Sequence, residues 1–243
     1  YALDALNAFT ALLNTDISGR YLFAGAATDT KPVVGVDEML DGANGKAGFR
    51  RVMTERRLAD QGSDGRGRLS VGAAASVVTL AEDGDHPFGM KLSAVTSTLS
   101  NATVTGPSGT PKTLSVDFTG QPAVGDRITV TFALPDGTTA KIDLEAGSST
   151  DTTANTFQIG STTDETAANL SGLIDAKLQD LGKTELVAAS AVQASNEFFD
   201  TAGGKAPLRV DGPPFDTATA LVADTTYVDT VQWYRGTNDS SPA

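Results

Sequence analysis

The chain has 243 residues and a formal net charge of -12, because 30 Asp and Glu residues outnumber 18 Lys and Arg residues. This balance argues against a nucleic-acid partner, since binding phosphates requires clustered basic side chains. The sequence contains no cysteine, which excludes disulfides, thiolate nucleophiles and cysteine-based zinc sites.

No run approaches the roughly 18 apolar residues that cross a bilayer, and no basic segment followed by an apolar one opens the chain. We therefore expect a soluble chain without a membrane partner. The 40% apolar content and the 25 glycines favour a β-rich globular body that is large enough for two domains. A helical pattern is already under way at Tyr1 and the last residues are turn-rich, so we interpret the sequence as a fragment cut from a longer polypeptide.

The first segment reads as a helix followed by a turn and a short strand. Apolar residues recur at steps of three and four, which places them on one helical stripe: Leu3, Leu6, Phe9, Leu13 and Ile17. Gly19 is expected to end this helix. Residues 21–23 then form a short aromatic strand, and residues 28–30 before Pro32 form a turn.

A second helix is expected over residues 49–61, after a Gly- and Asn-rich loop. Its apolar face carries Phe49, Val52 and Met53. Four arginines are expected mostly outside this face, either solvated or in contact with an acidic neighbouring subunit: Arg50, Arg51, Arg56 and Arg57. Residues 62–68 form a turn whose glycine spacing matches no nucleotide-binding fingerprint. Residues 69–80 follow with strand-like positions.

Acidic and turn residues crowd together at 82–87, where we place a domain boundary. Beyond it, residues 114–118 and 128–132 alternate apolar and polar side chains, as half-buried strands do. The sequence Pro135-Asp136-Gly137 connects the second of these to residues 139–144 as a hairpin. Residues 156–159 supply a further short strand.

The pattern then changes to helical. Thr162 and Glu165 fit a capping box, and the apolar stripe that follows predicts a helix over about 163–182 that covers the sheet. Residues 186–199 are expected to return as helix. The fold class is therefore α+β: an elongated, discontinuous helix-plus-β domain of residues 1–81 and 205–243, interrupted by an inserted β-sheet domain of residues 82–204 with its covering helix.

No constellation in the chain predicts catalysis. The only histidine, His86, stands in a turn, and no Gly-x-Ser-x-Gly elbow accompanies it, so a Ser-His-Asp triad is not expected. Glu82, Asp83 and Asp85 could offer oxygen ligands to calcium, but their spacing is not that of an EF-hand loop, and a solvated turn is the preferred interpretation. Paired carboxylates for glycoside hydrolysis stay open in so acidic a chain. We predict no catalytic residue, no cofactor and no metal site, and hence a protein that is not an enzyme.

Two distant segments resemble one family. Residues 19–25, with residues 28–33 behind them, resemble the end of the long N-terminal helix of bacterial flagellins and related hook-filament junction proteins. Residues 229–236 are similar to the strand and turn that lead back into the C-terminal helices of that family. The middle, residues 80–199, resembles the inserted domain of a subgroup of long flagellins.

This resemblance implies a structural subunit of the flagellar filament that contributes to motility. It implies export to the cell exterior without a cleaved signal peptide, and assembly with copies of itself in a helical filament through the missing terminal helices. The implied partners also include a flagellar export chaperone and hook-associated proteins. A hook-filament junction protein is the first alternative, and an extracellular carbohydrate-binding or adhesive module is the second.

Three structural expectations follow. The fragment alone should be monomeric, because only a short part of an apolar seam is present. Residues 82–200 should fold independently. Trp233 should share a strand face with Tyr227 and Val231, and should pack against Tyr21 or Phe23 so that the two ends of the chain lie side by side.

Overall fold

The computed structural model describes residues 1–148, 155–201 and 204–237. It has an α+β fold, and the chain divides into two compact units that alternate along the sequence. Unit 1 comprises Tyr1–Arg56, Ala191–Asp211 and Leu221–Ala243, and unit 2 comprises Arg57–Ser190 and Gly212–Ala220. Two helices contribute residues to both units: α3 (Phe49–Gln61) and α5 (Glu185–Phe199).

Unit 2 is built from two antiparallel-rich sheets. In the described residues, the first sheet has the order β5-β6-β9-β8 and the second the order β12-β11-β10-β7, in which β12 runs parallel to β11. The strands of the first sheet are β5 (Leu69–Ala74), β6 (Val77–Glu82), β8 (Ala102–Ser108) and β9 (Thr113–Phe118). Those of the second are β7 (Lys91–Ser97), β10 (Arg127–Ala133), β11 (Thr139–Gly147) and β12 (Thr156–Gln158). The four strands expected beyond residue 110 are thus confirmed, including the β10–β11 hairpin.

Alternation explains how these sheets make one core. Leu114, Val116 and Phe118 are buried along β9, while the intervening residues are exposed or half-buried, and β10 follows the same pattern. One hydrophobic cluster contains buried residues of both sheets and of the following helix. Burying the same face of each strand fixes the strand register, because a shift of one residue would expose every apolar side chain.

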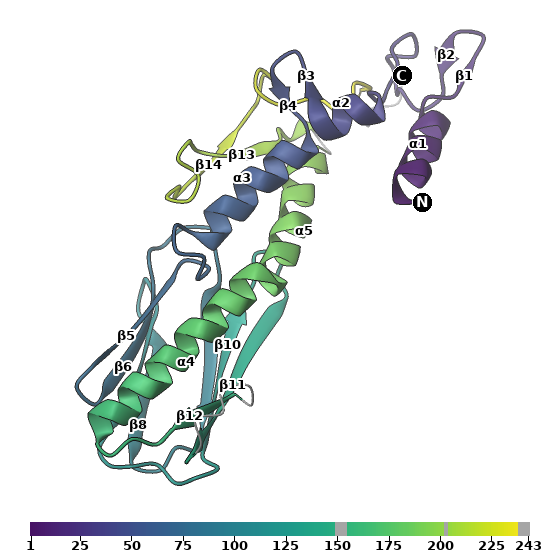
Figure 1. Cartoon of the computed structure of the whole chain (residues 1–243). Coiled ribbons are helices and arrows are strands. Elements are labelled where there is room, and N and C mark those ends of the chain that lie inside the picture. The colour runs from purple at the N-terminus through teal and green to yellow at the C-terminus, as the bar shows by residue number, and fades with distance from the viewer. Residues whose placement is uncertain (149–154, 202–203, 238–243) are drawn as a thin grey trace. The chain divides into compact units, whose positions relative to one another are not determined.

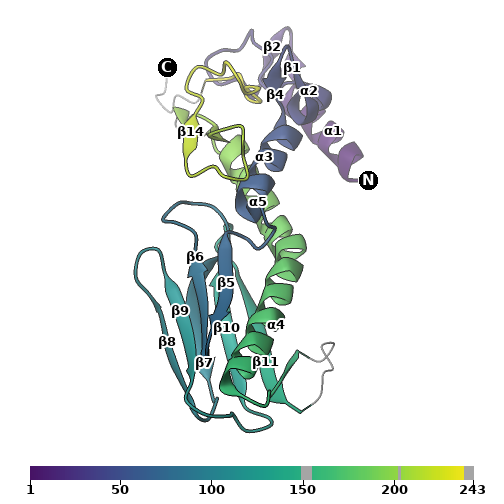
Figure 2. The same ribbon diagram turned by 60° about the vertical axis from the view of Figure 1, so that its left-hand side comes forward.

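Helix α4 (Thr163–Lys183) completes this core. The Thr162 hydroxyl accepts a hydrogen bond from the Glu165 amide at 3.2 Å, so the expected N-cap is confirmed. The buried apolar residues of the helix recur at helical spacing: Leu170, Leu173, Ile174, Leu178 and Leu181. The helix packs against β5 and β6 of the first sheet and β12 of the second, and Figure 2 shows it lying along the sheets.

The domain boundary expected at residues 82–87 is wrong in position. Strand β6 pairs with β9 from Val77 to Ala81, so the strands before residue 82 belong to the same sheet as those after it. Residues 82–200 therefore lack two strands of their own sheet. The division of the chain falls instead within α3 and α5, each of which contributes residues to both units.

Unit 1 consists of short elements that surround a smaller core. Its elements are α1 (Ala2–Leu13), β1 (Asp16–Ile17), β2 (Arg20–Tyr21), α2 (Val36–Asp41), β3 (Gly42–Ala43), β4 (Lys46–Ala47), β13 (Leu208–Val210) and β14 (Leu221–Ala223), with parts of α3 and α5 (Figure 1). The buried residues of the core are Val33, Val34, Met39, Ala47, Val52, Phe198 and Val231. The helices expected at 49–61 and 186–199 are confirmed by α3 and α5.

The first helix ends four residues before Ile17. Asn14 follows α1, and its side chain both donates to the Val33 carbonyl at 2.9 Å and accepts from the Val33 amide at 3.0 Å. Ile17 then pairs with Arg20 across a two-residue turn in which Ser18 and Gly19 both have positive φ. Gly19 therefore shapes a hairpin rather than a helix end, because a contact with a distant residue overrides the helical spacing.

The segment 227–237, which we call the returning chain, is bound to the first segments of unit 1. The Val34 amide donates to the Trp233 carbonyl at 3.1 Å, and the Ala47 amide donates to the Asp229 carbonyl at 2.8 Å. Residues 227–233 form no regular strand, in contrast to the expectation. Trp233 is half-buried and lies edge-on to Phe199, with ring centroids 5.6 Å apart, rather than against Tyr21 or Phe23.

Unit 1 contains a buried ion pair between Arg209 and Glu55. The Arg209 guanidinium meets both carboxylate oxygens of Glu55, from Nε at 2.8 Å and from Nη2 at 2.6 Å. The side chains are only 14% and 3% exposed. Arg209 also donates to the Asp229 carbonyl at 2.9 Å. One arginine thus joins α3, β13 and the returning chain.

We predict that Arg209→Met destabilises unit 1 by about 3–5 kcal/mol, because it leaves the negative charge of the buried Glu55 carboxylate poorly neutralised. Urea-induced unfolding measures the effect. Arg50→Met is the matched control: Arg50 pairs with Asp41 at the surface, where both side chains are more than half exposed, and such pairs contribute little. Equal midpoints for the two variants would contradict this role of Arg209.

Two glycines of α4 give a second comparison, in unit 2. A Cβ at Gly182 would overlap the Gly65 carbonyl oxygen, whereas a Cβ at Gly172 would meet nothing within 4 Å. We expect Gly172→Ala to stabilise the protein by about 1 kcal/mol through helix propensity. Gly182→Ala should instead destabilise it by about 1–3 kcal/mol, as overpacking does. Thermal unfolding should shift in opposite directions for the two variants, and a shared direction would show that the loop at Gly65 yields freely.

Candidate functional site

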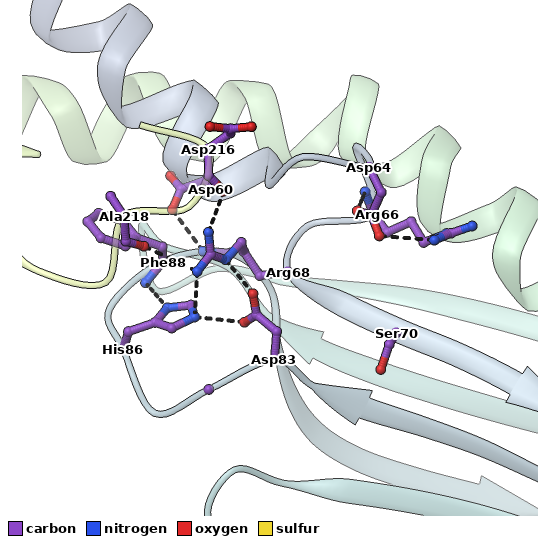
Figure 3. Close-up of polar contacts among 12 residues, drawn as sticks. Asp60, Asp64, Arg66, Arg68, Ser70, Asp83, His86, Phe88, Asp216 and Ala218 are labelled. Carbon is purple, nitrogen blue, oxygen red and sulfur yellow. Dashed lines mark hydrogen bonds and ion pairs between the residues drawn. The ribbon is translucent and has the colours of Figure 1, made fainter. Parts of the chain in front are cut away.

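A buried polar cluster of unit 2 surrounds Arg68, directly before β5 (Figure 3). The Arg68 side chain is 6% exposed. Its Nη1 donates to the Asp216 carbonyl at 2.5 Å and its Nη2 to the Ala218 carbonyl at 3.1 Å. Its Nε lies 2.7 Å from Asp83 Oδ2 at an angle poor for a hydrogen bond, so this contact is an ion pair. Arg68 therefore holds residues 212–220, which we call the strap, against the rest of unit 2.

The backbone around Arg68 is shaped for this role. Arg68 has a φ of 67°, which costs a non-glycine residue about 1–2 kcal/mol. Gly89 lies against it with a φ of +80°, and a Cβ there would come within 2.6 Å of the Arg68 Cβ. The Gly89 amide donates to buried Asp60 of α3 at 2.8 Å. The close approach of this loop requires glycine and keeps the guanidinium in place.

His86 completes the cluster with both ring nitrogens engaged. Its Nε2 lies 2.7 Å from Asp83 Oδ1 and 3.1 Å from Arg68 Nη2, and its Nδ1 is 3.3 Å from the Phe88 amide. An amide can only donate and a carboxylate can only accept, so the contacts with Phe88 and Asp83 assign a neutral ring that donates from Nε2 to Asp83. Arg68 Nη2 is also a donor, so its approach to Nε2 is a contact rather than a hydrogen bond in this tautomer. Burial lowers the pKa of His86, the hydrogen bond that the ring donates to Asp83 opposes this shift, and the charge of Lys91 lowers the pKa further.

This arrangement does not supply a general base. Figure 3 shows Ser70 on the strand apart from the cluster; its hydroxyl faces the Ala81 carbonyl at 3.4 Å, and neither His86 nitrogen contacts it. A depression of about 290 Å³ opens beside the cluster and is lined by Arg68, Asp83 and Asp216 among others. Solvent reaches Asp83, which is 39% exposed, while the His86 side chain is only 3% exposed.

Two of the three acidic residues considered for calcium, Glu82 and Asp83, have protein partners, and the third, Asp85, is exposed. Glu82 accepts from the Leu92 amide at 2.7 Å and from the Lys112 amide at 3.3 Å. Asp83 is shared between Arg68 and His86, as described above. Within residues 1–148, 155–201 and 204–237, no three Asp, Glu or His side chains gather closely enough to hold a metal ion.

The glycine-rich loop at residues 62–68 follows helix α3 and precedes strand β5, which is the reverse of the order in a phosphate-binding loop. Arg66 within it pairs with Asp64 at 2.9 Å and with Asp175 of α4. The carboxylates of Asp175, which has the larger effect, and of Asp64 raise the pKa of Arg66. The loop therefore connects elements of unit 2 through its own charges.

The four arginines of α3 have different surroundings. Arg56 is buried and pairs with Glu197 of α5, where both side chains are at most 3% exposed, so its expected position outside the apolar face is wrong. Arg50, Arg51 and Arg57 are exposed, as expected. Arg51 approaches Glu55 at 3.2 Å. The charge that could meet an acidic neighbour is smaller than the sequence indicates.

The other notable surface is the helix α1. Its exposed apolar side chains include Leu3, Phe9 and Leu12, with 49%, 56% and 60% of their surface accessible. Alanines occupy four further positions, and Asp4 is the one charged residue of the helix. The exposed residues Ile17, Leu22 and Phe23 follow directly. A helix whose exposed side chains are mostly apolar is normally covered by a partner.

Sequence reasoning found α1 but described it as a one-sided stripe. The alanines at positions 2, 5, 8 and 11 are the signal that shows an apolar surface extending around the helix. It did not find Arg68, whose partners are backbone carbonyls of a distant segment. Every residue has a backbone carbonyl, so the residue types of the strap do not indicate which carbonyls bind Arg68. Only the structure identifies this cluster.

Comparisons with models of protein families, with curated proteins and with solved structures found no match to this chain. Among the helices that the structure describes, none is both long and apolar enough to cross a membrane.

Proposed function

We propose that this chain belongs to a structural subunit of the bacterial flagellar filament, exported to the cell exterior and assembled with copies of itself. The observation that carries the proposal is the uncovered apolar helix α1 beside the place where the returning chain meets unit 1. The sequence resemblance of residues 19–25 and 229–236 to flagellins supports it, because both motifs lie in this part of unit 1.

The contacts between the two motifs are direct. The Tyr234 hydroxyl donates to the Phe23 carbonyl at 3.0 Å. Directly beside the motifs, the Ala26 amide donates to the Thr237 hydroxyl at 2.7 Å. In the proposed filament, α1 is covered by neighbouring copies, and removal of its apolar side chains from water stabilises the assembly.

The role is structural rather than catalytic in this proposal. The cluster around Arg68 binds carbonyls of the chain itself, and both ring nitrogens of His86 have partners. Unit 2 is then a body carried by the filament subunit, with the export chaperone and hook-associated proteins as further partners. These partners come from the resemblance.

Filaments sheared from the source cells test the proposal. Peptides of this chain should dominate their mass spectrum, and gold-labelled antibodies against unit 2 should mark filaments along their whole length in electron micrographs. Labelling confined to the filament base would overturn the filament proposal in favour of a hook-filament junction protein. Filaments that carry no label would contradict both.

We predict that Phe9→Gln in the full-length subunit shortens or abolishes filaments while leaving the unfolding free energy of the isolated chain within about 0.5 kcal/mol, because an exposed side chain contributes little to folding. Val124→Gln is the control: Val124 is 67% exposed in unit 2, and its replacement should leave filaments intact. Filament length is measured by electron microscopy. Normal filaments from the Phe9 variant would show that α1 does not contact other copies.

A further inference from the structure

We propose that Arg68, Asp83 and His86 form a pH-sensitive latch, in which protonation of His86 releases the strap of residues 212–220 from unit 2. The proposal concerns a conformational device and is independent of the function proposed above.

The latch follows from the places where a second proton could be bound. The neutral ring donates from Nε2 to Asp83 Oδ1, so an added proton must go to Nδ1. That nitrogen faces the Phe88 amide at 3.3 Å, which is itself a donor. Two N–H groups cannot share this contact, and the imidazolium would also stand beside the Arg68 guanidinium, 3.1 Å from Nε2. Protonation therefore removes one hydrogen bond and adds a like-charge contact in a buried place.

Other charged groups around the ring do not cancel this effect. Asp83 favours the charged ring but is already paired with Arg68, and Lys91 of β7 opposes protonation. The remaining charged groups of the surrounding elements are Asp60 of α3, Glu82 of β6, Asp85 of the His86 loop and Asp216 of the strap. Glu82 accepts hydrogen bonds from two backbone amides, and Asp60 accepts one from the Gly89 amide.

The strap is the element that responds, because Arg68 connects it to the ring. The two hydrogen bonds from Arg68 end on the carbonyls of Asp216 and Ala218. Ala218 is 6% exposed, whereas Thr219 next to it is exposed. Displacement of the guanidinium from a protonated His86 removes both bonds and exposes Ala218 to solvent.

The direction of the pH dependence follows from the lowered pKa of His86 in the closed state. When the strap is open, His86 regains a value near 6.5 and takes up a proton as pH falls through that value. The closed state binds the proton only at lower pH, so opening becomes more favourable between about pH 7 and pH 5. His86 is the only histidine in the chain, and unperturbed carboxyl groups stay ionised in this window.

Single-cysteine labelling tests the latch, since the chain contains no native cysteine. The rate at which a thiol reagent labels Ala218→Cys, divided by its rate with Thr219→Cys, reports strap opening, because the division cancels the pH dependence of the thiol's own reactivity. We expect this ratio to rise about tenfold from pH 7.5 to pH 5.5, the maximum change for one proton over the unit below pH 6.5. The NMR signals of His86 should titrate with the same midpoint.

Two backgrounds and one control make the result decisive. In His86→Gln, which retains a donor toward Asp83 but does not titrate, the ratio should not change with pH. In Arg68→Met it should be high at both pH values. Ala140→Cys in β11, which is 7% exposed, should stay protected throughout. A pH-dependent ratio in His86→Gln, a constant ratio in the parent, or labelling of Ala140→Cys in parallel with the strap would each overturn the latch.

Discussion

Each unit is closed by a segment that arrives late in the chain, and in both cases an arginine makes the closing contact. Arg209 reaches Glu55 across 154 positions of sequence, and Arg68 reaches the strap carbonyls across 148 and 150 positions. A guanidinium suits both tasks because its five donors can bind a carboxylate in parallel or serve two carbonyls at once. Neither unit is complete until the last third of the chain is in place, so non-local closure is a condition for the rest of the structure.

This mode of closure explains why α1 can stay uncovered. The core of unit 1 is formed by Val33, Val52, Phe198 and Val231, with Leu13 the residue of α1 that packs against it. Asn14 ties the helix end to Val33 through two hydrogen bonds. The helix is thus held at its end while most of its apolar surface faces solvent. Short isolated helices are marginal in water, and coverage by neighbouring copies would stabilise this one under the proposed function.

Local sequence patterns predicted the elements whose causes are local. The alternation in β9 and β10 and the cap and stripe of α4 define those elements without reference to the rest of the chain. The end of α1, the place of the domain division and the partner of Trp233 could not be predicted. Each depends on a distant residue: Val33 for Asn14, β9 for β6, and Phe199 for Trp233. Arg68 was missed for the same reason, since its acceptors are main-chain atoms.

The two motifs that carry the family resemblance have a physical reason to occur together. Gly25 has a φ of +63°, and a Cβ there would overlap Thr237. A Cβ at Gly236 would in turn overlap the Tyr234 side chain and approach the Ala24 carbonyl at 2.9 Å. Each glycine therefore permits a close approach between the motif segments. Either motif alone would leave the polar groups of the other without these partners, so the pair acts as one structural feature, although more than 200 residues separate its halves.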